Sequence, residues 1–520
     1  MTLGALDQQV YPIVPIAVVF IYPGTPSTTC TSPAIPLPAL KTALSHLLDT
    51  YPHLTGRLHI SPTTGTRSID RLGSGIHLHA ATCAATQASL TPPNARLTLP
   101  DLPAGGNALL APYEPTLAAV CADRTPILSV QHTAFACGAV ALGLRALHTV
   151  VDSDAFFQIV RDLAAVYRSL FPATTTTSTT CLRPADDAPA VHPPPPPPTP
   201  LTPYLAAETG GGGLTAEERH EALAFRPALF AVEDEEGKEA VPERYADKTQ
   251  DATPTPTPPV EGRVMRFTRA QLAALKTAAA GDAADAWVST YDALSALVWT
   301  RVHAARVRLL KQQRGGNDKD EGEGERLPSR DYLTSVNYRA RLALPARYPF
   351  NAVFAPYTRL AHGELMGPDA LPVAARTVHG LTRSVGVEEA RATARWMAAQ
   401  PDKRRVKWGF DGGYGSTMIS AWNKFDVYAG TAFVEGRPPV LVAPPFTPMS
   451  LVDGLGRQAT IYLAIYADMA EFFQPRMLQQ LRRRVPLLGL PGQHAAHEIH
   501  EVVSVLFILV KHARQTFQRA

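Results

Sequence analysis

Two residue types that can move protons, a histidine and an aspartate, stand four positions apart in His148-Thr-Val-Val-Asp152. An imidazole is the side chain best suited to act as a general base near neutral pH, and a nearby carboxylate can polarise it. The spacing alone is a weak signal, because a chain with 16 histidines is expected to contain roughly one such pair by chance. The alternative is a histidine that only satisfies backbone groups at the end of a strand.

The residues around this pair predict a rigid junction between a strand and a helix. Residues 127–135 and 139–147 are short apolar runs, and Cys137-Gly138 between them predicts a tight turn that joins two adjacent strands. His148 follows the end of the second strand. Beyond Asp152 the apolar residues recur at helical spacing, with acidic and hydroxyl side chains in the first turn. Such a junction fixes a side chain and leaves it reachable.

Length and charge narrow the classes of protein. A chain of 520 residues is too long for one ordinary core, so two domains are expected. The formal net charge of +3, from 49 basic and 46 acidic residues, gives no electrostatic reason to expect nucleic acid or an anionic membrane as partner. The apolar runs at 10–22 and 502–510 are too short to span a bilayer. Small-molecule chemistry is therefore favoured.

The five cysteines, at positions 30, 83, 121, 137 and 181, are scattered and include no Cys-x-x-Cys pair. This pattern argues against a disulfide framework and against a structural zinc site, and it predicts a reducing, cytoplasmic location. His494, His497 and His500 could share one helical face with Glu498, but no carboxylate shell supports them, so no metal site is expected.

Composition divides the chain into four parts. Residues 1–172 carry the histidine motif, and residues 261–484 show a second set of ordered patterns. Between them, residues 173–260 are rich in Pro, Thr and Gly, which predicts a flexible crossover with a few docked pieces, such as residues 223–230. Residues 485–520 form an extension of unknown role.

Periodicity predicts mixed α/β structure in both halves. Capping boxes at Thr268 with Gln271 and at Ser289 with Asp292 each predict the start of a helix. Helices are also expected at 37–51 and around 369–400. Strands are expected at 10–22, 262–267, 332–342, 417–422, 425–430, 439–444 and 460–466.

Two common catalytic motifs are missing from the sequence. There is no Gly-x-Ser-x-Gly nucleophile elbow and no Gly-x-x-x-x-Gly-Lys-Ser/Thr phosphate loop. Gly454-Leu-Gly-Arg-Gln-Ala459 matches a relaxed dinucleotide pattern, but it precedes a strand instead of following one, which indicates a turn.

With these positions in hand, the chain resembles the BAHD-type acyl-CoA-dependent acyltransferases, and within them the fungal trichothecene 3-O-acetyltransferase branch. The likeness rests on four features in order, which together cover most of residues 5 to 480 outside the crossover. They are His148-Thr-Val-Val-Asp152 after the Cys-Gly turn, Val288-Ser-Thr-Tyr-Asp-Ala-Leu-Ser-Ala-Leu-Val-Trp299, Val336-Asn-Tyr-Arg339-Ala-Arg341-Leu with Phe350-Asn351-Ala-Val downstream, and Ser416-Thr-Met-Ile-Ser-Ala-Trp422 leading to Asp426-Val-Tyr-Ala-Gly430.

The resemblance implies an α/β fold of two chloramphenicol-acetyltransferase-like domains with a solvent channel between them. His148 would be the general base at the middle of the channel, where acyl-CoA, with acetyl the expected acyl group, and a small hydroxyl or amine acceptor meet. The resemblance implies no bound cofactor and no acyl-enzyme, and a monomer is expected. Such an arrangement turns a bimolecular encounter into an effectively unimolecular step.

The resemblance also suggests roles for the other candidate site residues. The aspartate equivalent to Asp152 faces away from the histidine in the family and pairs with an arginine, here Arg339, with Arg341 the fallback on the same strand face. Asp152 nevertheless stays a catalytic candidate beside His148, while Arg339, Asp426 and Gly430 are candidates for structural support.

The sequence departs from the family at two motifs. Ser153 replaces the glycine after the aspartate, and only Asp426 and Gly430 survive of Asp-Phe-Gly-Trp/Leu-Gly. A carrier-protein-dependent condensation enzyme is one alternative, although Leu147 stands where that class usually has a second histidine. A catalytically dead relative that binds a metabolite is another, favoured by the altered Asp426 motif and opposed by the retention of His148 and Asp152.

Overall fold

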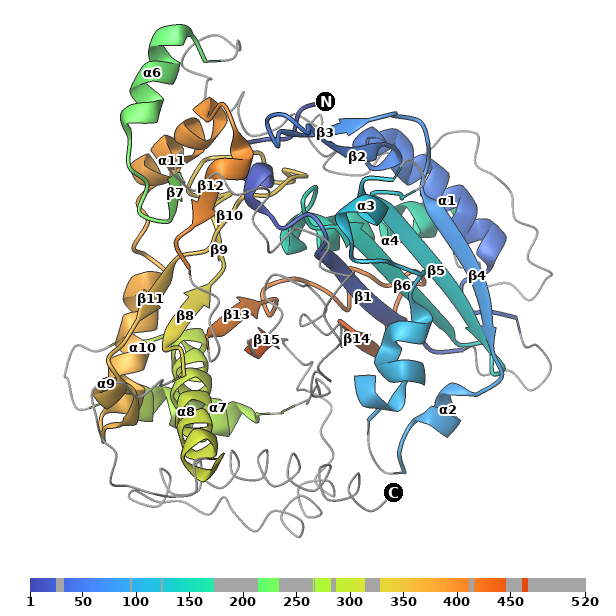
Figure 1. Cartoon of the computed structure of the whole chain (residues 1–520). Coiled ribbons are helices and arrows are strands. Elements are labelled where there is room, and N and C mark those ends of the chain that lie inside the picture. Colours follow the sequence, from blue (N-terminus) through green and yellow to red (C-terminus); the bar gives the residue numbers. More distant parts are fainter. Residues whose placement is uncertain are drawn as a thin grey trace.

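The computed structural model describes residues 1–24, 32–93, 96–122, 125–172, 214–232, 265, 267–281, 287–313, 328–410 and 416–445, and the strand at Ile461–Ile465. The chain forms two mixed α/β halves that lie side by side, each with its own sheet and helices (Figure 1). The predicted α/β class is therefore confirmed.

A five-stranded sheet organises the first half. It is antiparallel except at one edge, where β4 runs parallel to β5. One edge strand comes from the second half of the chain, so the two halves share this sheet. The strand order is β14 (Leu441–Ala443), β1 (Pro15–Tyr22), β6 (Val140–Leu147), β5 (Leu128–Phe135) and β4 (His77–Cys83).

Helices α1 (Leu37–Thr50) and α4 (Ser153–Leu170) cover one face of this sheet (Figure 1). Their apolar stripes join alternate side chains of the strands in one buried core. The predicted turn between β5 and β6 is present, with Gly138 at a positive φ of 77° that favours glycine. The predicted helices at 37–51 and after Asp152 are confirmed. Both pack in the core that also contains Leu147 and Val150, the neighbours of His148.

A four-stranded sheet organises the second half, with helices α7, α8 and α10 packed around a separate core. Both predicted capping boxes are present: Thr268 with Gln271 and Ser289 with Asp292 exchange the expected hydrogen bonds. The strand order is β11 (Tyr357–Arg359), β8 (Asp331–Thr334), β13 (Thr417–Ala421) and β15 (Ile461–Ile465), and the helices are α7 (Arg269–Ala280), α8 (Thr290–Gln313) and α10 (Ala370–Leu381).

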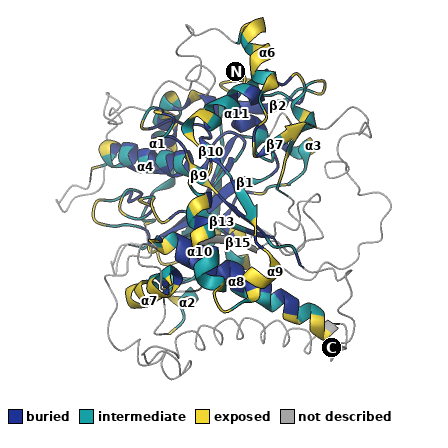
Figure 2. Cartoon of the chain, turned by 90° about the vertical axis from the view of Figure 1, so that its left-hand side faces the viewer, coloured by how far each residue is buried: buried dark blue, intermediate teal, exposed yellow. Residues whose placement is uncertain are grey.

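Smaller elements surround the two sheets. Figure 2 shows buried strands such as β1 near the centre, with exposed surface on outer elements such as α6, α7 and β7. The remaining helices are α2 (Gln87–Leu90), α3 (Leu117–Val120), α6 (Ala216–Ala224), α9 (His362–Met366) and α11 (Val387–Ala399), with short 3-10 turns at Asp7–Gln9, Pro52–Thr55, Leu99–Asp101, Pro103–Leu109 and Lys403–Arg405. Among the described residues, two-stranded ribbons pair β2 (Arg57–Ile60) with β3 (Arg67–Asp70), β7 (Phe230–Val232) with β12 (Val406–Trp408), and β9 (Val336–Asn337) with β10 (Val353–Phe354).

One piece of the crossover is docked, as the sequence predicted. Helix α6 packs on α11, and β7 pairs with β12, so residues 214–232 join the second half. The rest of 173–260 lies outside the described residues, as do the extension at 485–520, the run at 502–510, the turn at 454–459 and the candidate histidines at 494–500. The same holds for most of the strand expected at 262–267.

Two predicted strands are wrong. Residues 332–342 form strands only as far as Asn337; the chain then turns, with the Leu342 N–H bonded to the Tyr338 carbonyl, so Arg339 and Arg341 do not share a strand face. Residues 425–430 form a loop whose buried Val427 accepts a hydrogen bond at its carbonyl from the Thr431 hydroxyl. A loop that packs one side against the core also alternates apolar and polar residues. Its sequence therefore shows the same pattern as a half-buried strand.

Gly143, in the middle of β6, gives a direct test of packing on the second face of the first sheet. A Cβ at this position would meet the backbone carbonyl of Leu109, which no side-chain rotation can relieve. Gly143→Ala is therefore expected to reduce the free energy of unfolding by about 1 to 3 kcal/mol. Thermal denaturation measures the loss. Gly363→Ala in α9, where the added Cβ meets open space, is the control, and an unchanged melting temperature for Gly143→Ala would contradict the packing.

Within the described residues, no helix has both the length and the apolar content needed to cross a membrane.

Candidate active site

His148 lies in a turn directly after β6, and its backbone is held on both sides. Its N–H donates to the carbonyl of Val14, with 3.3 Å between nitrogen and oxygen. Its carbonyl accepts from Asn351 Nδ2 at 3.0 Å. The turn itself closes through the N–H of Val150, which donates to the carbonyl of Leu147 at 2.9 Å. The residue directly before β1, the histidine turn and a segment of the second half therefore fix the position of this residue together.

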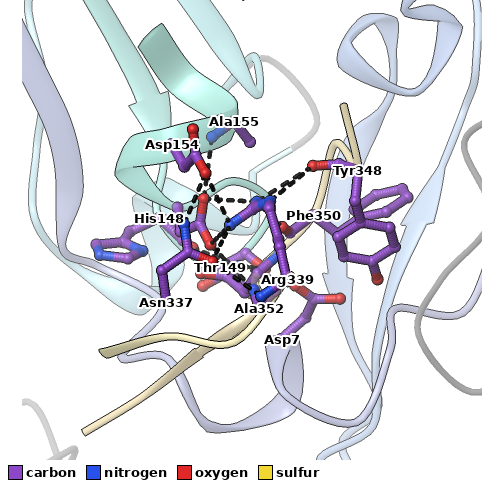
Figure 3. Close-up of polar contacts among 12 residues, drawn as sticks. Asp7, His148, Thr149, Asp154, Ala155, Asn337, Arg339, Tyr348, Phe350 and Ala352 are labelled. Carbon is purple, nitrogen blue, oxygen red and sulfur yellow. Dashed lines mark hydrogen bonds and ion pairs between the residues drawn. The ribbon is translucent and has the colours of Figure 1, made fainter. Parts of the chain in front are cut away.

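The imidazole of His148 is half-buried and points away from Arg339 (Figure 3). Its Nδ1 atom is buried and completes no well-formed hydrogen bond with the described residues. Burial lowers the pKa of His148 below its ordinary value of 6.5, and the charge of Asp152 opposes that shift only in part. The ring is thus neutral at pH 7 and able to accept a proton.

Asp152 is buried and bonded on both carboxylate oxygens. Oδ1 accepts from the N–H of Ala155 at 3.0 Å, which caps helix α4, and from Arg339 Nη2 at 2.8 Å. Oδ2 accepts from Arg339 Nη1 at 2.7 Å and from the N–H of Ala352 at 2.9 Å. Burial alone would raise the pKa of Asp152, but the guanidinium and these donors hold it below the ordinary value. The carboxylate is used by partners other than the imidazole.

The pair expected between Asp152 and Arg339 is present, and it reaches across the two halves of the chain. Arg339 also donates from Nε and Nη2 to the carbonyl of Tyr348 and from Nη2 to the carbonyl of Phe350. Arg341, the fallback partner, lies elsewhere: it donates to the carbonyl of Thr382. The histidine turn is thereby tied to the turn at 339–343.

Two residues of this site were not identified as functional from the sequence. Asn351 donates to Asp7 Oδ1 from both its backbone N–H, at 3.0 Å, and its Nδ2 atom, at 2.8 Å. Asp7 is completely buried, and burial raises its pKa to about 7 against the lowering effect of these hydrogen bonds. The Phe350-Asn351 motif was part of the resemblance, but nothing in it indicated a contact with the histidine turn, and Asp7 carried no signal at all.

Asp426 and Gly430 lie against helix α4 and not beside His148. A Cβ at Gly430 would come within 2.8 Å of both Arg161 Cδ and Asp426 Oδ2, so this loop packs closely on the helix. Burial lowers the pKa of Arg161, and the charge of Asp426 opposes that shift. Arg161 is nine residues along α4 from Asp152, about 14 Å at helical rise. This position fits a supporting role for the loop.

Across the described part of the chain, no group of three or more His, Cys, Asp or Glu side chains is arranged to hold a metal ion. The groups at the junction are one neutral imidazole, held by its backbone, and a buried ion pair.

The two α/β halves have the chloramphenicol-acetyltransferase-like fold, with His148 at a strand end where they meet and Asp152 turned onto Arg339. The sequence matches the model of the Transferase family over residues 1–203 and 212–449. The chain belongs to this family, the BAHD-type acyltransferases, whose members use acyl-CoA as co-substrate without a bound cofactor.

Solved structures and one curated protein are similar to this chain. The structure of F. sporotrichioides TRI101 in complex with coenzyme A and T-2 shares 19% identity, covers 89% of this chain and 91% of its own, and has a TM-score of 0.54. F. graminearum TRI101 with coenzyme A and T-2 mycotoxin shares 16% identity over 90% of this chain and 92% of its own, also at a TM-score of 0.54. At these identities the likeness shows the fold. Acyltransferase GLAUCE of Arabidopsis thaliana is 29% identical over 127 residues, which span 24% of this chain and 26% of that protein's length.

Proposed function

We propose that the protein transfers an acyl group, with acetyl the expected one, from acyl-CoA to a hydroxyl or amine of a small secondary metabolite, and that His148 is the general base. The observation that carries this proposal is the placement of His148 between the two halves, with both of its backbone groups bonded and a neutral imidazole turned away from Arg339, the partner of Asp152.

The reaction follows from this geometry in two proton transfers. His148 Nε2 takes the proton of the acceptor's hydroxyl or amine while the oxygen or nitrogen attacks the thioester carbonyl carbon. The tetrahedral intermediate then collapses, the carbon–sulfur bond breaks, and coenzyme A leaves as a thiolate. The imidazolium returns the proton to that sulfur, so the histidine is neutral for the next cycle. No covalent acyl-enzyme is required, which agrees with the missing nucleophile elbow.

Asp152 has a supporting part in this proposal. Its carboxylate caps α4 and binds Arg339, so it fixes the turn that carries His148 without touching the imidazole. Asp426 and Gly430 support the same helix further along its length, at Arg161.

We also propose that residues 1–172 and 261–484 are the two acyltransferase domains and 173–260 the crossover between them. The docking of 214–232 and the strand that the second half adds to the first sheet support this division. A monomer in the cytoplasm is expected, and the described free cysteines Cys83, Cys121 and Cys137 fit a reducing compartment.

Release of coenzyme A thiol by the purified protein tests the proposal. The protein is mixed with acetyl-CoA and panels of terpenoid, phenolic and polyamine alcohols and amines, and the acylated product is identified by mass spectrometry. Acceptor-dependent thiol release is the expected result. Thiol release only from carrier-bound acyl groups would contradict the proposed function. The absence of acceptor-dependent release across the whole panel would contradict it as well.

A further inference from the structure

Two residues in contact at the site each carry a buried polar atom, and these two atoms have complementary chemistry. His148 Nδ1 and Asn351 Oδ1 are both buried, and neither completes a well-formed hydrogen bond with the described residues. The two residues are in direct contact, because Asn351 Nδ2 donates to the His148 carbonyl at 3.0 Å. One atom can be a donor and the other is an acceptor, so a hydrogen bond between them would satisfy both.

The surroundings of Asn351 determine which way its amide points. Its Nδ2 atom donates to Asp7 Oδ1 and to the carbonyls of His148 and Thr149, at 2.8, 3.0 and 3.3 Å. Rotating the amide by 180° would place Oδ1 against two backbone carbonyl oxygens, which cannot donate, and against Asp7 Oδ1, which already accepts the Asn351 backbone N–H. The amide oxygen is therefore directed away from these three acceptors and is left for another donor.

We propose that Asn351 is the positioning residue of His148: its Oδ1 accepts a hydrogen bond from the Nδ1 proton of the imidazole, which leaves Nε2 as the unprotonated base, and Asp7 locks the amide in that orientation. This inference rests on the proposed role of His148 as general base. A histidine works as a base only in the tautomer whose free nitrogen faces the substrate, and the partner on the other nitrogen selects that tautomer.

Asp7 is suited to this task. Its Oδ2 accepts from the N–H of Gly4 at 2.9 Å, and its Oδ1 accepts both donors of Asn351. The short 3-10 turn at Asp7–Gln9 is held in turn by Gln8, whose side chain bonds the carbonyls of Leu3 and Arg67. Burial lowers the pKa of His148. Hydrogen bonding with its own backbone, the charge of Asp152, the Asn351 side chain and the backbone of Val151 raise the pKa against that effect.

The most direct test observes the tautomer itself. In the full-length protein with ¹⁵N-labelled histidine, the signal of His148 is assigned by its loss in His148→Ala, and the proton is located from the two ring nitrogen shifts. We expect the neutral wild-type ring to carry its proton on Nδ1, and Asn351→Ala to populate the other tautomer. A wild-type ring protonated on Nε2, or the same tautomer in both proteins, would overturn the inference.

Kinetics provide a second, independent readout. Asn351→Ala should lower kcat by roughly 10- to 100-fold, less than loss of the base itself, with KM for acyl-CoA within about threefold. Its acid limb in kcat/KM should move to lower pH, because the amide oxygen favours the protonated ring. Asn351→Asp should move that limb to higher pH, since a carboxylate favours the charged ring more strongly. A merely structural residue would not shift the limb in opposite directions.

Three controls separate the possible failures. Thr300→Ala, a buried polar change within helix α8, should alter stability without moving the pH profile. Asp7→Ala removes the acceptor of the Asn351 amide. It tests the same chain of contacts if the Asn351 variants do not fold, and it should lower kcat like Asn351→Ala. If His148→Ala keeps its turnover, the proposed function fails. If His148→Ala loses turnover while Asn351→Ala and Asp7→Ala keep the wild-type kcat and pH profile, only the positioning role fails.

Discussion

Replacing His148 by alanine is expected to lower turnover by roughly 10²- to 10⁴-fold, the usual contribution of a general base. The fold should survive, because the bonds that hold this turn come from the backbone of residue 148 and not from its ring. Steady-state release of coenzyme A, measured with an acceptor identified for the wild type, gives the loss. Thermal denaturation shows whether the variant is folded.

A matched histidine keeps this experiment specific. His59→Ala changes an exposed histidine on β2 and should leave turnover within about twofold of wild type, as surface changes usually do. Folded His148→Ala protein that releases coenzyme A at nearly the wild-type rate would remove His148 from the mechanism.

The second large effect is on stability, and it comes from the Asp152 and Arg339 pair. Each side chain is almost fully buried, with 1% and 9% of its surface exposed, so removing one partner leaves an uncompensated charge. Asp152→Asn and Arg339→Met are each expected to cost about 3 to 5 kcal/mol of unfolding free energy. Because the folded protein holds the pKa of Asp152 below its ordinary value, the pair stabilises at neutral pH. The difference from Asp152→Asn should shrink as pH falls below the ordinary aspartate range.

The double variant Asp152→Asn/Arg339→Met shows whether the two residues act as a unit. It should be clearly more stable than the sum of the two single losses predicts, because neither charge is left alone. Denaturant unfolding at pH 7 measures all four proteins. Strictly additive losses, or a fully stable Asp152→Asn protein whose only defect is a changed pH profile, would return Asp152 to a direct catalytic role.

The elements that carry His148 could be predicted because their signals are local. The turn at Cys137-Gly138 and the helix after Asp152 each follow from residues close together in sequence, and both are present. The Asp152 and Arg339 pair lies 187 positions apart and came only from the family resemblance, since no pattern in one sequence links such distant residues.

Tertiary contacts explain the errors. In the turn at 339–343, Arg339 contacts both Asp152 and the carbonyls of Tyr348 and Phe350. These tertiary contacts outweigh the strand preference indicated by the alternation of residues 332–342. The loop at 425–430 packs its inner side on α4, where Phe425 lies 5.4 Å from Phe157 between ring centres. Asp7 and Asn351 lie 344 positions apart, and neither residue type is unusual in its local sequence, so only the folded chain shows their contact.

The pH dependence of thiol release tests the central claim, that a neutral His148 is the base, most directly. With saturating acceptor, kcat/KM for acetyl-CoA is measured from pH 4.5 to 8 in wild type and in His148→Ala. Burial lowers the pKa of His148 below 6.5, and a base must be unprotonated to act. The wild type should therefore keep its activity to more acidic pH than an ordinary histidine allows and then lose it in one acid limb, while the residual rate of His148→Ala shows no such limb. The same acid limb in both proteins would contradict the account.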